Sequence, residues 1–319
     1  MIALLLAASV LLAPAPRALP APPMDADSAS VSYVELSSSP VGPRRYRLVV
    51  PAGDARAARP LVVALHGCTQ DAADFARGSR LDRAAAERGW LVAYAEQPEG
   101  ANPRKCWNWF VPAHQGRDAG EPALVEAIRA DVARRHAVDP ARTWLVGVSA
   151  GAAMAGITAL AYPERWAAVV MHSGLALLAA RDPMAAVTQM QQGTSDAAAA
   201  LEAARTLVRG AAVPDALVIH GETDPVVRVA NAAQLATQWA SLAGATAAVR
   251  DPHAPADARV AVTAHAAAGD AHVRVASWRI AGLAHAWSGG DPAGSWTDAA
   301  APDATSALLD WLAAHPRRR

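Results

Sequence analysis

A serine between glycines, in the segment Gly-Val-Ser-Ala-Gly at 147–151, has the residue types of a catalytic nucleophile. An apolar run at 143–146 precedes this segment, and a run of small residues at 152–161 follows it. A strand, a sharp turn and a helix in this order form a nucleophile elbow, where glycines avoid clashes and the serine hydroxyl stands exposed. The alternative is a turn serine without chemistry. The flanking pattern favours Ser149 as a nucleophile.

A serine nucleophile needs a base that takes its proton and an acid that orients the base. In hydrolases with this elbow the acid precedes the base in the chain. The apolar run at 216–219 leads into His-Gly-Glu-Thr-Asp-Pro, which delivers carboxylates at a strand end. We predict Asp224 as the acid, with Glu222 as the alternative. Both also fit solvated turn residues, because Asp-Pro is an ordinary turn signal.

The predicted base is His285, in a glycine-flanked loop that follows the predicted strand at 273–280. Position selects it, because the loop after the last strand reaches the same edge of the sheet as the nucleophile. The alternative is a loop histidine that caps backbone groups. The competing histidines lie in an irregular stretch, before that last strand or in the terminal helix: His253, His265, His272 and His315.

An oxyanion hole needs backbone N–H groups where negative charge develops on the carbonyl oxygen. Ala150, directly after the predicted nucleophile, would supply one of them from the start of its helix. The second is expected from the loop at 66–70, where we favour the N–H of Cys68 over that of Thr69. His66 is expected to hold this loop rather than a metal, since no spaced partner ligands accompany it. No metal and no cofactor is predicted.

These residues all follow short apolar runs, and the runs define the expected fold. Runs without alternation are typical of strands buried on both faces, and they occupy residues 61–65, 90–95, 143–146, 167–171 and 216–219. Helical patterns lie between them, at 72–88, 121–136, 150–161 and 230–242. The alternation predicts the α/β class and an α/β-hydrolase fold, with a mostly parallel central sheet and helices on both faces.

The remaining stretches fit around this sheet. Residues 31–36 and 44–50 alternate as a solvent-facing hairpin would, and 184–210 read as a helical cap insertion. Residues 245–271 are expected to form a surface excursion with a possible strand. No repeat divides the chain, so a single catalytic domain is expected over residues 30–315.

The N-terminal residues have the pattern of an export signal. An apolar run at 1–13 is too short to span a bilayer and a proline-rich segment follows it, so residues 1–23 are predicted to be a signal peptide and leader. A buried first helix is the alternative. The expected location is secreted, extracellular or periplasmic, with no membrane span in the mature chain.

The amino-acid composition limits which classes of protein and partner are expected. With 53% hydrophobic and 18% charged residues the chain can bury a core, which argues against disorder. Its 29 basic and 29 acidic residues give no reason to expect nucleic acid or a membrane surface as a partner.

The only two cysteines, Cys68 and Cys106, each follow one of two consecutive predicted parallel strands. Those strands are neighbours in the usual order of this fold, and an exported protein meets oxidising conditions, so a disulfide is expected. Its closed loop would contribute about 3 to 4 kcal/mol. Two buried free thiols are the alternative.

Ten tryptophans stand against two phenylalanines. We predict that Trp107 and Trp109, after Cys106, and Trp287, after the predicted base, line the substrate site, together with Trp296. For Trp107 and Trp109, core packing is an equal alternative. Four others are expected in the core: Trp90, Trp144, Trp166 and Trp311.

Several rare strings occur in order along the chain: LHGCTQ, AEQ, CWNWF, RDAGEP, GVSAGAAMA, HSG, GLAHAWSGG and a later Pro-Asp-Ala. With these strings the sequence resembles the extracellular poly(3-hydroxybutyrate) depolymerase-type esterases, which are akin to feruloyl and acetylxylan esterases, over residues 44–314. The resemblance implies a triad of Ser149, Asp224 and His285. It also implies ester hydrolysis. One departure is Ala152, where the family commonly has glycine.

The expected function is a secreted serine esterase that hydrolyses carboxylic esters of the hydroxyalkanoate type through an acyl-enzyme. Such depolymerases usually carry a binding domain after the catalytic one, whereas this sequence stops at Arg319, so soluble oligomers and small aryl or acetyl esters are equally expected. The alternatives are a feruloyl or acetylxylan esterase, a peptidase, and a non-catalytic relative that binds polymer or carbohydrate.

Overall fold

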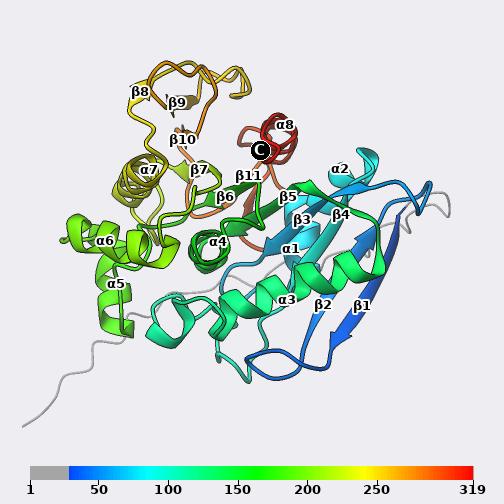
Figure 1. Ribbon diagram of the computed structural model, residues 1–319. Helices are drawn as coiled ribbons and strands as arrows, with labels where there is room; N and C mark the ends of the chain where they lie inside the picture. The colour runs from blue at the N-terminus through cyan, green and yellow to red at the C-terminus, as the bar shows by residue number, and fades with distance from the viewer. Residues whose placement is uncertain (1–28, 319) are drawn as a thin grey trace, which may run out of the picture.

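A ten-stranded sheet forms the centre of the protein in the computed structural model, which describes residues 29–318 (Figure 1). The strand order is β1-β2-β4-β3-β5-β6-β7-β10-β9-β8. In chain order the strands are β1 (Ser30–Leu36), β2 (Arg44–Val50), β3 (Arg59–Leu65), β4 (Leu91–Ala95), β5 (Val138–Val148), β6 (Ala168–His172), β7 (Asp215–Gly221), β8 (Ala247–Ala248), β9 (Val260–Ala266) and β10 (Val275–Ile280). The predicted signal peptide and leader at 1–23 lie outside the described residues.

The middle of the sheet is parallel, from β4 through β3, β5, β6 and β7 to β10. Antiparallel pairs close both edges, β1 and β2 on one side and β9 and β8 on the other. A small separate pair joins β11 (Trp287–Ser288) to β12 (Thr297–Asp298). The predicted α/β class with a mostly parallel sheet is confirmed.

Helices cover both faces of this sheet (Figure 1). Side chains of β3 alternate between two cores: Leu61 and Leu65 pack with α3, α4 and α7, whereas Val62 packs with α1, α2 and α8. All three side chains are fully buried, which is why the strand reads as a continuous apolar run. The helices are α1 (Ala72–Ser79), α2 (Leu81–Glu87), α3 (Gly120–Arg135), α4 (Ala150–Ala161), α5 (Pro183–Gln192), α6 (Ala197–Val208), α7 (Ala230–Ala243) and α8 (Ala304–Ala314), with a 3₁₀ turn at Pro112–His114.

Two expectations about the elements need correction. The helix expected at 72–88 is two helices, because Arg80 takes a left-handed φ of 55° between α1 and α2. The strand expected at 143–146 is longer and runs over the whole of β5. The possible strand in the excursion at 245–271 is present as β9, which pairs with β10 along its length, and β8 extends the sheet beyond it.

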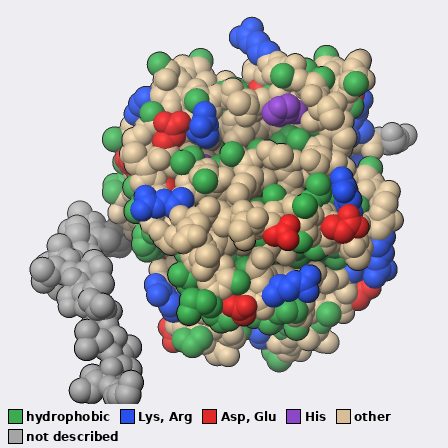
Figure 2. Space-filling view, turned by 90° about the vertical axis from the view of Figure 1, so that its left-hand side faces the viewer, with side chains coloured by type: hydrophobic (Ala, Val, Ile, Leu, Met, Phe, Trp, Pro, Cys, Tyr) green, Lys and Arg blue, Asp and Glu red, His purple; other side chains and the backbone are tan. Residues whose placement is uncertain are grey.

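Residues 184–210 contain most of α5 and all of α6, which pack against α7 and α4. Their role as a cap stays a prediction, as does the single domain over 30–315. The face that carries α5, α6 and α7 mixes basic, acidic and apolar side chains, without a large region of one charge (Figure 2). Between residues 29 and 318, no helix is both long and apolar enough to cross a bilayer.

Candidate active site

Ser149 lies in a strained turn between β5 and α4, with φ 56° and ψ −122°. Glycines on both sides are required by close contacts. A Cβ on Gly147 would lie 2.3 Å from the carbonyl oxygen of Gly151, and a Cβ on Gly151 would lie 2.3 Å from that of Leu65. Strain of this kind persists only where the surrounding structure imposes it, and it is found at functional sites. The turn has the geometry expected of a nucleophile elbow.

The structure brings the three predicted triad residues together at the carboxyl edge of the parallel strands. His285 Nε2 lies 3.0 Å from Ser149 Oγ, and His285 Nδ1 lies 2.7 Å from Asp224 Oδ2. The residues follow β5, β7 and β10, three strands that end at the same edge. The alternative acid, Glu222, is exposed to solvent. The arrangement suits a serine, a base and an orienting acid.

Asp224 is buried and held as a carboxylate. Its Oδ1 accepts hydrogen bonds of 2.8 Å from the N–H groups of Val226 and Val227. Burial by itself would raise the pKa of the Asp224 carboxyl, but hydrogen bonds from His220 and His285 outweigh burial and hold that pKa well below its usual range. The acid therefore stays ionised beside the base at neutral pH.

The loop at 66–70 lies directly against the nucleophile. A Cβ placed on Gly67 would be 3.6 Å from the Cβ of Ser149. The N–H of Thr69, the alternative oxyanion donor, already donates to the carbonyl oxygen of Arg104 at 2.7 Å. Across residues 29–318, the N–H groups of Cys68 and Ala150 donate to no other protein group. These two donors are the ones predicted for the oxyanion hole.

His66 holds this loop in one conformation. Its Nε2 accepts the N–H of Gln97 at 3.1 Å, so its Nδ1 carries the proton and donates to the carbonyl oxygen of Gly67 at 2.7 Å. The side chain is fully buried, and burial lowers the pKa of its imidazole. A neutral histidine that bonds both sides of the loop agrees with the role expected from the sequence.

The expected disulfide is present between Cys68 and Cys106, whose Cα atoms are 4.2 Å apart. It joins the loop after β3 to the loop after β4, and these strands are parallel neighbours. It therefore fixes the same loop that carries the predicted oxyanion donor.

Replacing both cysteines with serine is expected to lower the free energy of unfolding by about 4 kcal/mol, because the bond closes a loop with a sequence separation of 38 residues. Urea unfolding of the oxidised wild type and the double variant measures the difference. Wild type treated with a reductant is the matched control and should approach the variant. A loss below about 1 kcal/mol would contradict this role for the bond.

The prediction that Trp107, Trp109 and Trp287 line the substrate site needs correction. Their exposed fractions are 0%, 5% and 2%, so all three lie in the core. Trp107 donates its indole N–H to the carbonyl oxygen of His66, and Trp287 donates to Thr305 Oγ1. Trp107 thus contacts the loop at 66–70 from within the core.

Trp296 is the exposed tryptophan beside the candidate base. Its side chain is 47% exposed and its ring centroid lies 5.8 Å from that of His285. Its indole N–H donates to Thr69 Oγ1, in the loop at 66–70 that carries the predicted oxyanion donor. Of the aromatic residues suggested by the sequence, this one has a surface that a substrate can touch.

Sequence reasoning missed His220, which directly follows the apolar run at 216–219 and precedes the predicted acid. It is fully buried on β7, and its Nε2 donates to the carbonyl oxygen of Val227 at 2.8 Å while lying 3.5 Å from Asp224 Oδ2. His220 thus holds the turn from Asp224 to Val227 against β7. The signal that could have found it is its position four residues before the predicted acid, at the carboxyl end of a buried strand.

Residues 44–263 match the family model described as Esterase PHB depolymerase, which covers more than half of the chain. The chain belongs to this family of carboxylic ester hydrolases. Poly(3-hydroxyalkanoate) depolymerase C of Paucimonas lemoignei is 33% identical over 61% of the chain and 47% of that protein. Feruloyl esterase B of Neurospora crassa is 32% identical over 42% of the chain and 46% of that protein. The chain thus spans about half the length of these relatives.

Solved structures support the fold of this esterase PHB depolymerase family member. The acetyl xylan esterase from Aspergillus awamori matches with a TM-score of 0.65 and 20% identity, over 82% of this chain and 95% of that one. An S-formylglutathione hydrolase from Agrobacterium tumefaciens matches with a TM-score of 0.56 and 16% identity, over 92% and 98%. The α/β-hydrolase fold expected from the sequence is confirmed.

Proposed function

We propose that this protein is a serine esterase that hydrolyses carboxylic esters through an acyl-enzyme on Ser149. The observation that carries the proposal is the hydrogen-bonded series from Ser149 through His285 to Asp224, next to the N–H groups of Cys68 and Ala150, which have no other acceptor among residues 29–318. Nucleophile, base, orienting acid and oxyanion donors are the complete set for acyl transfer.

In the proposed reaction, Ser149 Oγ attacks the ester carbonyl carbon while His285 Nε2 takes the hydroxyl proton. The N–H groups of Cys68 and Ala150 stabilise the oxyanion, and Asp224 stabilises the imidazolium. Collapse breaks the bond to the alcohol oxygen, which leaves with the proton from His285. Water then attacks the acyl-enzyme by the same route, releasing the acid and restoring the serine.

The proposed substrates are hydroxyalkanoate esters, as oligomers or polyester. The match to a poly(3-hydroxyalkanoate) depolymerase supports this choice. A second candidate is an aryl ester of the feruloyl type, favoured by the exposed Trp296 ring beside His285, on which an aryl group can stack. The match to a feruloyl esterase supports that alternative, and relatives described as acetylxylan esterases suggest a third class, acetylated xylan.

An ester panel tests all three substrate classes. We expect 3-hydroxybutyrate trimer to have the highest kcat/KM, above methyl ferulate and acetylated xylan. A kcat/KM at least tenfold higher for methyl ferulate or acetylated xylan would move the substrate to that class. A peptide anilide included in the panel separates peptidase activity. No turnover together with no labelling of Ser149 by a fluorophosphonate would leave a non-catalytic binding protein.

We also propose that the protein is secreted, after removal of a signal peptide within residues 1–23. The disulfide between Cys68 and Cys106 supports this, because such bonds persist in oxidising compartments. Peptide mass mapping of the N-terminus of exported protein tests it.

A further inference from the structure

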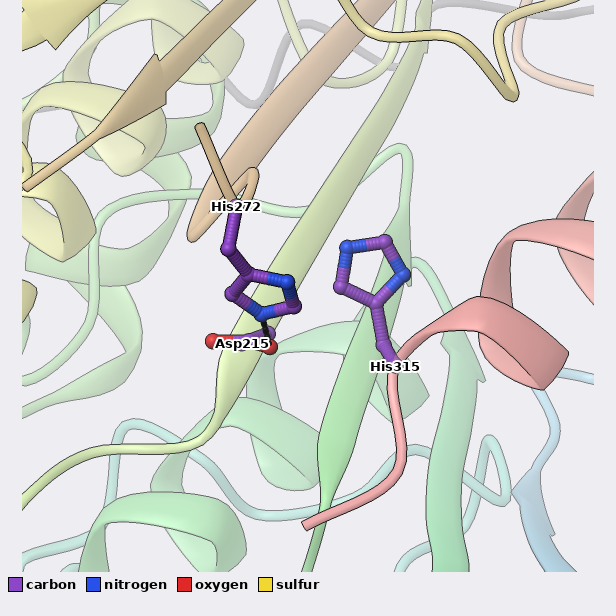
Figure 3. Close-up of side chains that lie close together, drawn as sticks. All are labelled: Asp215, His272 and His315. Atoms are coloured by element: carbon purple, nitrogen blue, oxygen red, sulfur yellow. Dashed lines mark hydrogen bonds and ion pairs between the residues drawn. The ribbon is translucent and has the colours of Figure 1, made fainter. Parts of the chain in front are cut away.

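Three ligand-type side chains converge at the edge of the sheet opposite the candidate active site. Asp215 begins β7, His272 precedes β10 and His315 follows α8, and their side chains lie together (Figure 3). Each offers one ligand atom, and these atoms all lie within 4.8 Å of one another. His272 Nε2 is 2.6 Å from Asp215 Oδ2. Segments far apart in the chain thus form a compact set of two imidazoles and one carboxylate.

His315 has one more hydrogen-bond acceptor around its ring than a neutral imidazole can satisfy. Its Nδ1 lies 2.6 Å from the carbonyl oxygen of Trp311, and its Nε2 lies 3.0 Å from the carbonyl oxygen of Val273. A neutral ring donates from one nitrogen only, and carbonyl oxygens only accept. With the proton on Nδ1, two lone pairs face each other across 3.0 Å, and a cation between them would relieve the repulsion.

Neighbouring groups hydrogen-bond to the side chains of the cluster and hold them in place. Arg274 Nε donates to Asp215 Oδ1 at 2.5 Å, which orients the carboxylate and leaves Oδ2 directed at His272. The contact of His315 Nδ1 with a backbone carbonyl is 2.6 Å against 3.0 Å for Nε2, and the shorter contact favours the tautomer that leaves Nε2 as a ligand. A surface cavity of about 330 Å³ reaches Asp215 and is also lined by Arg274 and Arg317.

We propose that Asp215, His272 and His315 bind a divalent transition-metal ion of the Zn²⁺ type. Two imidazoles and one carboxylate are a donor set that such ions favour. Ligands about 2.1 Å from a tetrahedral ion lie about 3.4 Å apart, so side-chain shifts of roughly 1 Å bring the three atoms to those positions. Water from the cavity completes the coordination.

The metal would have a structural role, independent of the proposed esterase chemistry. Asp215 and the turn that holds Asp224 lie at opposite ends of β7, a seven-residue strand about 20 Å long. The ion would join β7, the approach to β10 and the segment after α8. Binding to the folded chain alone stabilises it by an amount that rises with the logarithm of the ion concentration once that concentration exceeds the Kd.

Calorimetric titration of the chelator-treated full chain with ZnCl₂ tests the proposal. We expect one ion per chain, and a rise in Tm of about 4 °C when free zinc is 100 times its Kd. Co²⁺ in place of Zn²⁺ should give the absorption of a tetrahedral ion with nitrogen and oxygen ligands. Absence of binding by the wild type would overturn the proposal.

His272→Ala is the decisive variant, because His272 is partly exposed and its loss should leave the fold intact. We expect at least a 100-fold weaker zinc affinity, no zinc-dependent rise in Tm, and unchanged turnover of p-nitrophenyl butyrate. His265→Ala, a histidine of similar exposure on β9, is the matched control and should bind zinc as the wild type does. Equal affinity in His272→Ala and wild type, or equal loss in both variants, would overturn the assignment.

Discussion

Replacing Ser149 with alanine is expected to lower kcat for p-nitrophenyl butyrate by about 10⁴- to 10⁶-fold. The hydroxyl is the group that His285 Nε2 faces at 3.0 Å, and alanine leaves the base nothing to deprotonate. Residual turnover would come from the oxyanion donors and from substrate binding. Steady-state kinetics and labelling by a fluorophosphonate, which needs the serine oxygen, measure the effect.

Ser173→Ala is the matched control for this variant. Ser173 follows β6, the neighbouring strand, and also has a positive φ, of 53°. Its hydroxyl contacts the ring of His172 instead of the candidate base. We expect the control to keep kcat within a few-fold of the wild type. Near-normal turnover by Ser149→Ala would remove Ser149 from the mechanism.

Asp224→Asn is expected to lower kcat by about 10⁴-fold with little change in KM. An asparagine keeps the shape, and its oxygen can still accept the N–H groups of Val226 and Val227. Its amide, however, would donate to His285 Nδ1. The ring would then carry its proton on Nε2, facing Ser149, and could not accept another.

Kinetics across pH show whether the Asp224 carboxyl itself titrates in the range where kcat is measured. Because the pKa of Asp224 lies well below its ordinary value, the wild-type carboxylate stays ionised above about pH 5, and a fall in kcat between pH 5 and 8 reports another group. Glu222→Gln, at the exposed alternative acid, should change kcat less than twofold. If kcat fell strongly in Glu222→Gln and only slightly in Asp224→Asn, Glu222 rather than Asp224 would be the acid.

The positions of the triad candidates could be predicted because they depend on topology. Parallel strands deliver their carboxyl ends to one edge, so residues that directly follow β5, β7 and β10 converge whatever the details of packing. The cysteines became predictable for the same reason, since β3 and β4 are parallel neighbours.

The tryptophans depend on tertiary contacts that no local pattern records. Trp107 turns inward because its indole N–H reaches the carbonyl oxygen of His66, far away in the chain. The break between α1 and α2 also depends on the chain's fold rather than on a local pattern, because the residue with the left-handed φ is Arg80 and not a glycine.

The exclusion of His272 as the base rested on its being at the wrong end of the sheet. The structure agrees, since His272 contacts Asp215 at the start of β7. The sequence does not show that His315 joins this cluster, because His315 reaches it only through the packing of α8 on the sheet.

The exposure of Trp296 allows the candidate active site to be studied by intrinsic tryptophan fluorescence. Of the ten tryptophans, Trp296 is 47% exposed and the others are at most 7% exposed. Acrylamide in solution will therefore quench the fluorescence of this indole before that of any other. Its ring centroid lies 5.8 Å from that of the candidate base, so occupancy of the site can be followed by emission, without a label.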